Sequence, residues 1–116
     1  MPAITLADAE ALAERCIDAC NRVMVDDEDD ALVELVSPDV SIEIVDTVTD
    51  QLTGPHELAE RLRRSAYHGG LELYDVIVDG SDVVAGVAWA DEPTLRIAEV
   101  RLVPHVDRIV RIEWVE

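Results

Sequence analysis

Apolar residues recur at helical spacing near the start of the chain, at Leu12, Cys16, Ala19, Cys20 and Val23. This spacing is typical of one buried helix face. Ahead of it, Thr5 and Asp8 have the separation of a capping box, in which a hydroxyl caps the helix and a carboxylate follows three residues later. The pattern predicts one long amphipathic helix that ends near Met24.

Two further helices follow. The acidic run DDEDD (residues 26–30) supplies a cap and an acidic first turn for a short helix, ALVELV, which Pro38 ends. The segment GPHELAERLRRSAYHGG predicts the third, because Gly54 can cap it and Pro55 suits the first helical position. Its buried stripe is expected to be Leu58, Leu62 and Ala66, with Arg61, Arg63 and Arg64 pointing outward. Gly69 is expected to end this helix in the left-handed conformation.

The rest of the chain shows strand patterns. The segment VSIEIVD alternates, with Val40, Ile42, Ile44 and Asp46 on one face, and predicts a half-buried strand. A short QLT segment precedes the third helix, and four strands follow it: LELYDVIV, VVAGVAWAD, TLRIAEVRLV and RIVRIEWVE. The apolar parity shifts between Leu73 and Val76, which predicts a β-bulge at Tyr74–Asp75.

This order of elements predicts an α+β fold in one domain, residues 1–116. Three helices from the first part of the chain are expected to pack on one side of a mostly antiparallel sheet. A strongly curved sheet would wrap these helices into a cone with a pocket at its open end. The last three strands carry apolar residues on both faces, more than one helix layer can cover. A homodimer through the outer face of the sheet is therefore expected.

Charge narrows the range of partners. The chain has 26 acidic and 9 basic residues, all nine of them Arg, for a formal net charge of −17. Such a surface repels phosphate backbones and anionic headgroups, so neither nucleic acid nor membrane is expected as a partner. The acidic composition is consistent with either a well-solvated surface or adaptation to high salt.

No segment has the length of a membrane span or the pattern of a secretion signal, so a cytoplasmic location is expected.

The two cysteines, Cys16 and Cys20, are four residues apart on one helix face. This spacing does not suit a disulfide, so they are expected to be reduced thiols in the core. No further His or Cys lies near them in sequence to complete a metal site. The sequence predicts no metal and no cofactor.

Over nearly its whole length the chain resembles the nuclear transport factor two-like superfamily, in its SnoaL-like branch. The resemblance rests on the element order and on the segments LVSPDVSIEIVD, LTGPHELAERL, YDVIVDGSDVVAGVAWAD and VRLVPHVDRIVRIEWVE. One departure is the last hairpin, which lacks the glycine usual after Asp107. The resemblance implies a cone that holds one small hydrophobic molecule, and it too implies a homodimer.

Individual activities of the superfamily can be compared by position. The ketosteroid isomerase residues would fall at Cys16, Ile44 and Arg96, none of which supplies the required group, so that activity is not expected. Dehydratase-type enzymes resemble this chain in carrying a histidine where the third helix meets the sheet, here His68, paired with an aspartate that falls at Asp26. A neutral imidazole can remove a proton while the carboxylate on its other nitrogen sets the tautomer.

Each candidate has a simpler interpretation. His68 suits a helix-terminal cation facing solvent, and Asp26 suits the start of a helix. Asp46 lies on the strand face expected to point into the cone, but it equally suits a turn. The expected pocket residues are Ile42, Ile44, Tyr67, Trp89 and Trp114, and the scarcity of aromatic rings favours a small or aliphatic ligand.

Two function classes follow. One is an acid–base lyase, isomerase or cyclase that uses His68 with Asp26 or Asp46 on a small hydrophobic metabolite. The other is a non-catalytic protein that binds such a molecule or serves as a dimeric assembly module.

Overall fold

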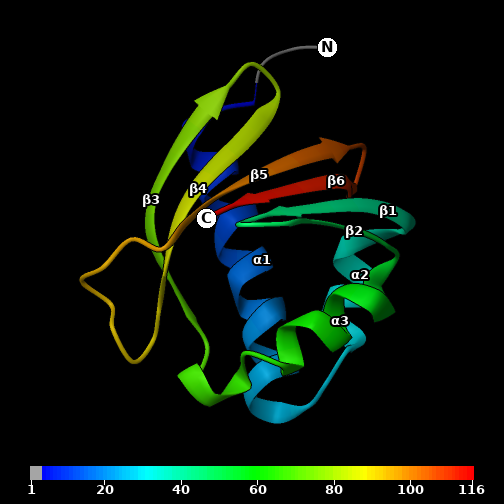
Figure 1. The fold of residues 1–116 in the computed structure, drawn as a ribbon. Coiled ribbons are helices and arrows are strands. Elements are labelled where there is room, and N and C mark those ends of the chain that lie inside the picture. The colour runs from blue at the N-terminus through cyan, green and yellow to red at the C-terminus, as the bar shows by residue number, and fades with distance from the viewer. Residues whose placement is uncertain (1–3) are drawn as a thin grey trace.

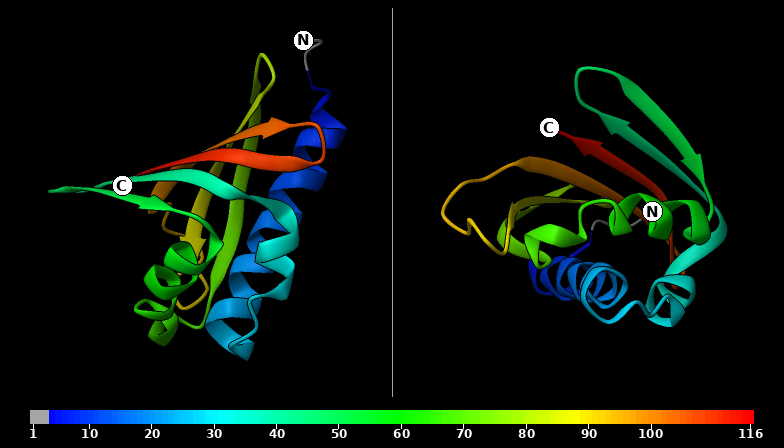
Figure 2. Two further views of the ribbon diagram at one scale, coloured as in Figure 1. Left: turned by 90° about the vertical axis from the view of Figure 1, so that its right-hand side faces the viewer. Right: turned by 60° about the horizontal axis from the view of Figure 1, so that its bottom comes forward.

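The computed structural model describes residues 4–116 of the chain, in which three helices cover one face of a six-stranded sheet (Figures 1 and 2). The helices are α1 (Leu6–Asp26), α2 (Asp30–Leu35) and α3 (Pro55–Arg63), with a 3-10 turn at Ala66–His68. The strands are β1 (Val36–Val45), β2 (Thr49–Thr53), β3 (Leu71–Asp79), β4 (Asp82–Trp89), β5 (Ala98–His105) and β6 (Arg108–Val115). The predicted α+β class is confirmed.

The sheet is mixed. Its order is β2-β1-β6-β5-β4-β3, in which β1 and β6 run parallel and the other neighbours antiparallel. Figure 2 shows it as an open, twisted layer and not as a strongly curled one, in contrast to the cone expected from the sequence. In residues 4–116 no helix has the length and apolar character that crossing a membrane requires.

The first helix follows its sequence pattern closely. The Thr5 hydroxyl accepts a hydrogen bond from the Asp8 backbone N–H at 3.2 Å, which confirms the predicted cap. The helix then buries one continuous face against the sheet, formed by Ala9, Ala13, Cys16, Ala19, Cys20, Val23 and Met24. Both cysteines are free and buried, as predicted. The helix runs two residues beyond the expected end, to Asp26.

Two boundaries differ from the sequence prediction. Strand β1 begins at Val36 and not at Val40, so Pro38 lies within the strand. Its pairing with β6 is interrupted between Val36 and Ser41, and this irregular stretch accommodates a proline because no ladder hydrogen bond is needed there. Helix α3 ends at Arg63, and a separate 3-10 turn carries the chain to Gly69, which is left-handed as predicted (φ 76°).

The predicted bulge is present in β3. The register passes from Leu73 opposite Val87 to Asp75 opposite Gly86, so Tyr74 is the extra residue. The Asp75 carboxylate accepts a hydrogen bond from the Gly86 N–H at 3.0 Å. A side chain therefore satisfies a backbone donor beside the irregular ladder.

Asn21 links α1 to the first residue of β3. Its side-chain oxygen accepts a hydrogen bond from the Leu71 N–H at 2.7 Å, and its amide nitrogen donates to the Leu71 carbonyl at 2.9 Å. One side chain thus pairs with both backbone groups of Leu71, in the way that a neighbouring strand would.

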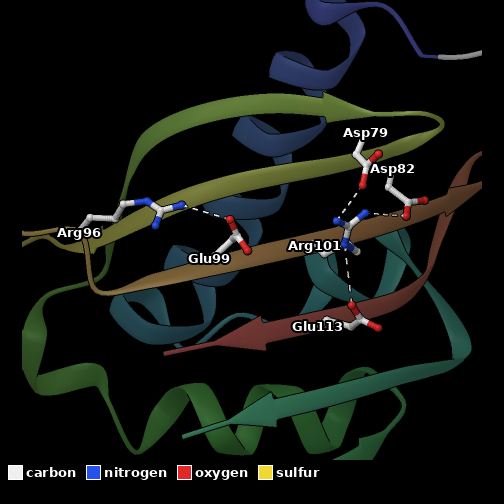
Figure 3. A network of polar contacts seen from close by, with 6 residues as sticks. All are labelled: Asp79, Asp82, Arg96, Glu99, Arg101 and Glu113. Carbon is white, nitrogen blue, oxygen red and sulfur yellow. Dashed lines mark hydrogen bonds and ion pairs between the residues drawn. The ribbon is translucent and has the colours of Figure 1, made fainter.

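The face of the sheet away from the helices carries a group of charged side chains (Figure 3). Arg101 on β5 reaches Asp79 at 2.9 Å, Asp82 at 3.0 Å and Glu113 at 3.9 Å. The hydrogen bonds to Asp79 and then Asp82 raise the pKa of the Arg101 guanidinium. We call these four residues the Arg101 cluster.

Candidate ligand-binding site

An apolar cavity of about 60 Å³ lies between α3 and the helix-covered face of the sheet. Its lining comes from four elements and the segments that follow them: Ile42, Ile44, Leu58, Arg61, Leu62, Ser65, Trp89, Ile112, Trp114 and Glu116. Most of these side chains are aliphatic or aromatic. Apart from the indole N–H groups of the two tryptophans, polar groups enter through Arg61, Ser65 and Glu116, so the interior suits a largely apolar molecule.

Sheet register explains how the cavity wall forms. In the parallel pairing of β1 with β6, Ile42 lies beside Ile112 and Ile44 beside Trp114. Alternate residues of a strand point to the same face, so these four side chains form one continuous apolar surface. Leu58 and Leu62 of α3 are one helical turn apart and close the other side.

Four of the five expected pocket residues line this cavity: Ile42, Ile44, Trp89 and Trp114. Tyr67 does not, because its side chain lies in the short 3-10 turn after α3 and is 80% exposed. Arg61 was expected to point outward, yet it is half-buried and contributes to the wall. The helical spacing of Leu58, Leu62 and Ala66 predicted a wholly apolar face on this side of α3, and that prediction was wrong.

A second, smaller cavity of about 30 Å³ lies deeper in the core. It shares Leu58, Leu62, Ile112 and Trp114 with the first cavity and is also lined by Cys16, Ile17, Cys20, Leu71 and Val100. The hydrogen bond between the two thiols lowers the pKa of Cys16 and, together with burial, raises that of Cys20. Among the described residues, no group of three or more His, Cys, Asp or Glu side chains is placed to hold a metal ion.

His68 lies beside the cavity but does not line it. Its ring stacks on that of Trp89, with the ring centroids 4.2 Å apart and the ring planes 8° apart. The ring centroid of Tyr67 lies 4.1 Å from that of His68. Its Nδ1 lies 3.0 Å from an oxygen of Asp91. The side chain is 21% exposed, so it is not the fully solvated helix-end cation of the simpler interpretation.

The two aspartates expected beside His68 lie elsewhere. Asp26 is the last residue of α1 and is exposed, and Asp46 is exposed because β1 ends one residue before it. The Asp46 N–H bonds to the Val48 carbonyl at 3.1 Å, as in the turn interpretation. Neither carboxylate is a hydrogen-bond partner of the His68 ring in residues 4–116; that partner is Asp91.

Sequence reasoning missed Asp91 because nothing local marks it. It follows Trp89 in a polar turn, and it reaches His68 only because Trp89 pairs with Leu71 across β3 and β4. The Ala90 N–H also bonds to the Gly70 carbonyl at 2.9 Å, which holds the two segments together. Such a contact depends on strand pairing and not on spacing along the chain.

Comparison with known proteins supports the fold. No family model matches the chain, and no curated protein sequence does either. Among solved structures, a SnoaL-like protein of unknown function from Burkholderia thailandensis is similar with a TM-score of 0.73 and 17% identity, over 97% of this chain and 96% of that one. A candidate ketosteroid isomerase from Kribbella flavida is similar with a TM-score of 0.65 and 21% identity, over 92% and 76%.

A candidate polyketide cyclase from Sinorhizobium meliloti is similar with a TM-score of 0.62 and 21% identity, over 90% of this chain and 93% of that one. A de novo designed protein of the same fold also matches, with a TM-score of 0.64 and 20% identity. At these identities the comparisons establish architecture and no activity. The chain therefore has the fold of the nuclear transport factor two-like proteins, in the form that SnoaL-like proteins share.

Proposed function

We propose that the protein binds a small, largely apolar molecule in the cavity between α3 and the sheet. The observation that carries this proposal is the cavity itself, with its aliphatic wall and two tryptophans. One water needs roughly 10–15 Å³ of such space, so a cavity of about 60 Å³ encloses a ligand of only a few non-hydrogen atoms. In this proposal the helix-covered face of the sheet acts as the back wall of a pocket that opens past α3.

Trp89 and Trp114 offer a direct test, because they are the only two tryptophans in the chain and both line the cavity. Titration with 3-methylbutan-1-ol should saturate and should change the tryptophan emission. It should also move the indole N–H signals in an NMR spectrum. Linear, non-saturating changes would contradict the proposal, since an alcohol acting only as a co-solvent gives that response.

A filled cavity should lose binding. Ile44→Phe adds bulk to a side chain that is 6% exposed and lines the cavity, so we expect the saturable response to disappear at a cost of about 1–3 kcal/mol in stability. Val45→Phe is the matched control, since the next residue of the same strand points to the opposite face. The proposal fails if both variants bind as the parent does.

A second candidate function is acid–base catalysis by His68 with Asp91, on a substrate seated in the same cavity. It is supported by the 3.0 Å contact between Nδ1 and the carboxylate and by the stacking of the ring on Trp89, a cavity residue. A carboxylate at Nδ1 favours the tautomer in which Nε2 is free to accept a proton. The candidate isomerase and cyclase among similar folds make proton abstraction next to a carbonyl the reaction class to test.

Deuterium exchange tests this second function without knowledge of the substrate. In heavy water, the protein should accelerate exchange of the α-protons of cyclohexanone, and His68→Gln should remove most of that acceleration. His56→Gln is the control, because His56 lies at the start of α3 and its side chain is 81% exposed. Equal exchange rates in the parent and the His68 variant would remove His68 from any catalytic role.

A further inference from the structure

Arg61 is the one cation in the wall of the apolar cavity. Ion pairing would be easy in a chain with 26 acidic and 9 basic residues. Glu57, four residues earlier, has the helical spacing that favours a pair, but its carboxylate accepts a hydrogen bond from the Thr53 N–H at 3.3 Å. Within residues 4–116, Arg61 takes part in no ion pair and no side-chain hydrogen bond.

Neighbouring arginines behave differently. Arg63, two residues along the same helix, binds the carboxylates of both Asp27 and Asp29. Arg64 has no ion pair in the described part of the chain, but it is exposed and lies outside the cavity. Arg61 therefore combines two properties. It is half-buried against apolar walls, and within residues 4–116 no carboxylate lies within 4.0 Å of its guanidinium, although Asp50, Glu57 and Glu60 line a groove on its outer side. A charge in such surroundings is costly unless a partner compensates for it.

Ser65 adds a second polar group to the same part of the wall. It follows Arg61 by four residues, and both side chains line the cavity. A guanidinium presents paired donors that match the two oxygens of a carboxylate, and a hydroxyl can donate one more hydrogen bond. Across the cavity, the strands contribute Trp and Ile side chains to the lining, which suits a hydrocarbon chain.

We propose that the ligand is a small monocarboxylic acid with a short hydrocarbon tail. Its carboxylate binds Arg61 and Ser65, and its tail lies against Trp89 and Trp114. This inference rests on the proposed function, because it concerns the same cavity. Glu116 also lines the cavity but is exposed, so solvent screens its charge and the anion binds on the Arg61 side.

The experiment compares 3-methylbutanoate with 3-methylbutan-1-ol, which share a carbon skeleton and differ in charge at neutral pH. Tryptophan emission and indole N–H shifts measure both affinities, in about 1 M sodium chloride so that the Debye length is only about 3 Å and the general negative charge is screened. We expect the carboxylate to bind more tightly than the alcohol. Arg61→Gln should weaken carboxylate binding about tenfold, as expected for one charge-assisted contact, and should leave alcohol binding nearly unchanged.

Arg64→Gln is the matched control, since it removes the same charge from the residue that follows α3 and lies outside the cavity. Glu116→Gln should leave carboxylate binding nearly unchanged, because the exposed charge of Glu116 is screened. Equal affinities for the two probes, or a loss of carboxylate binding that is the same in the Arg61 and Arg64 variants, would overturn the inference and leave the proposed function standing. If neither probe binds saturably, the proposed function fails and the inference fails with it.

Discussion

Asn21 shows how much one side chain can contribute to this fold. Two hydrogen bonds, of 2.7 and 2.9 Å, join its amide to the backbone of Leu71. Leu71 is buried and begins an edge strand, so its N–H and C=O would otherwise lack protein partners there. Gly70 fits beside this contact because a Cβ at that position would lie 2.8 Å from the Asn21 side-chain oxygen.

Replacing Asn21 with Ala should therefore destabilise the protein by about 2 kcal/mol, since it leaves two partly buried backbone groups unpaired. Urea denaturation measures the change. Arg22→Ala is the control on the same helix: its ion pair with Asp18 is exposed, and such pairs contribute roughly 0–1 kcal/mol. A loss for Asn21→Ala no larger than that for Arg22→Ala would contradict this account.

Single positions also mark where sequence reasoning works and where it stops. Ile42 and Ile44 were predicted as pocket residues, because alternation along a strand assigns faces from local pattern alone. Asp91 was not, since it contacts His68 across 23 residues through strand pairing. The prediction that Arg61 points outward was wrong, because helical spacing gives only the angular position of a residue around α3. It does not show how closely the sheet packs against that side of the helix.

For helices and strands, too, some features could be predicted from the sequence and others could not. A change in apolar parity revealed the bulge in β3, and the capping pattern placed the start of α1 correctly. The parallel pairing of β1 with β6 could not be read from either strand, because both carry the same alternation as an antiparallel pair. The end of α3 was also missed, since its last turn continues in 3-10 geometry with a similar side-chain pattern.

The turn between β5 and β6 carries a local strain. His105 and Arg108 pair with each other, so Val106 and Asp107 form a two-residue turn, and Val106 has a positive φ of 58°. A β-branched residue is disfavoured in this conformation. This is the hairpin in which the sequence lacks the glycine usual after Asp107. The unfavourable backbone conformation lies at Val106, two residues before Arg108.

Val106→Gly should consequently stabilise the protein. Relief of strain is worth about 1–3 kcal/mol, and the greater freedom of glycine in the unfolded chain returns roughly 0.4–1 kcal/mol, so we expect a net gain of about 1 kcal/mol in thermal or chemical denaturation. Asp107→Gly is the control, because Asp107 has no positive φ and the change brings only the entropic loss. Equal effects of the two substitutions would show that the turn is unstrained.

The net charge of −17 acts on the molecule as a whole. Like charges on a small domain repel one another, and salt screens this repulsion. We expect the midpoint of thermal unfolding to rise between low salt and about 1 M sodium chloride, where the Debye length is about 3 Å. The double change Asp26→Asn with Glu28→Gln should stabilise the protein in low salt and lose most of this effect in high salt. A midpoint that does not rise would show that the acidic surface needs no screening.

Self-association through the outer face of the sheet is still a prediction. Ile77 and Val115 are exposed hydrophobic residues, 57% and 44% respectively, while the Arg101 cluster occupies part of the sheet with charge. We expect a homodimer at micromolar concentration by sedimentation velocity. Arg101→Glu, which would leave Asp79, Asp82 and Glu113 without their cation, should shift the protein toward monomer. A parent protein that sediments as a monomer at these concentrations would rule the dimer out.

The pairing of β1 with β6 has a consequence for how the protein is made. Ile42 and Ile112 are neighbours in space but seventy residues apart in the chain, and contacts between distant segments slow folding. On the ribosome, β1 and the helices emerge long before β6. The edge of β1 that pairs with β6 therefore stays unpaired while synthesis continues. The cavity takes Ile112 and Trp114 of its wall from β6. The cavity is therefore incomplete until the last strand is in place, and a ligand of the proposed kind would stabilise the finished protein without guiding its nascent chain.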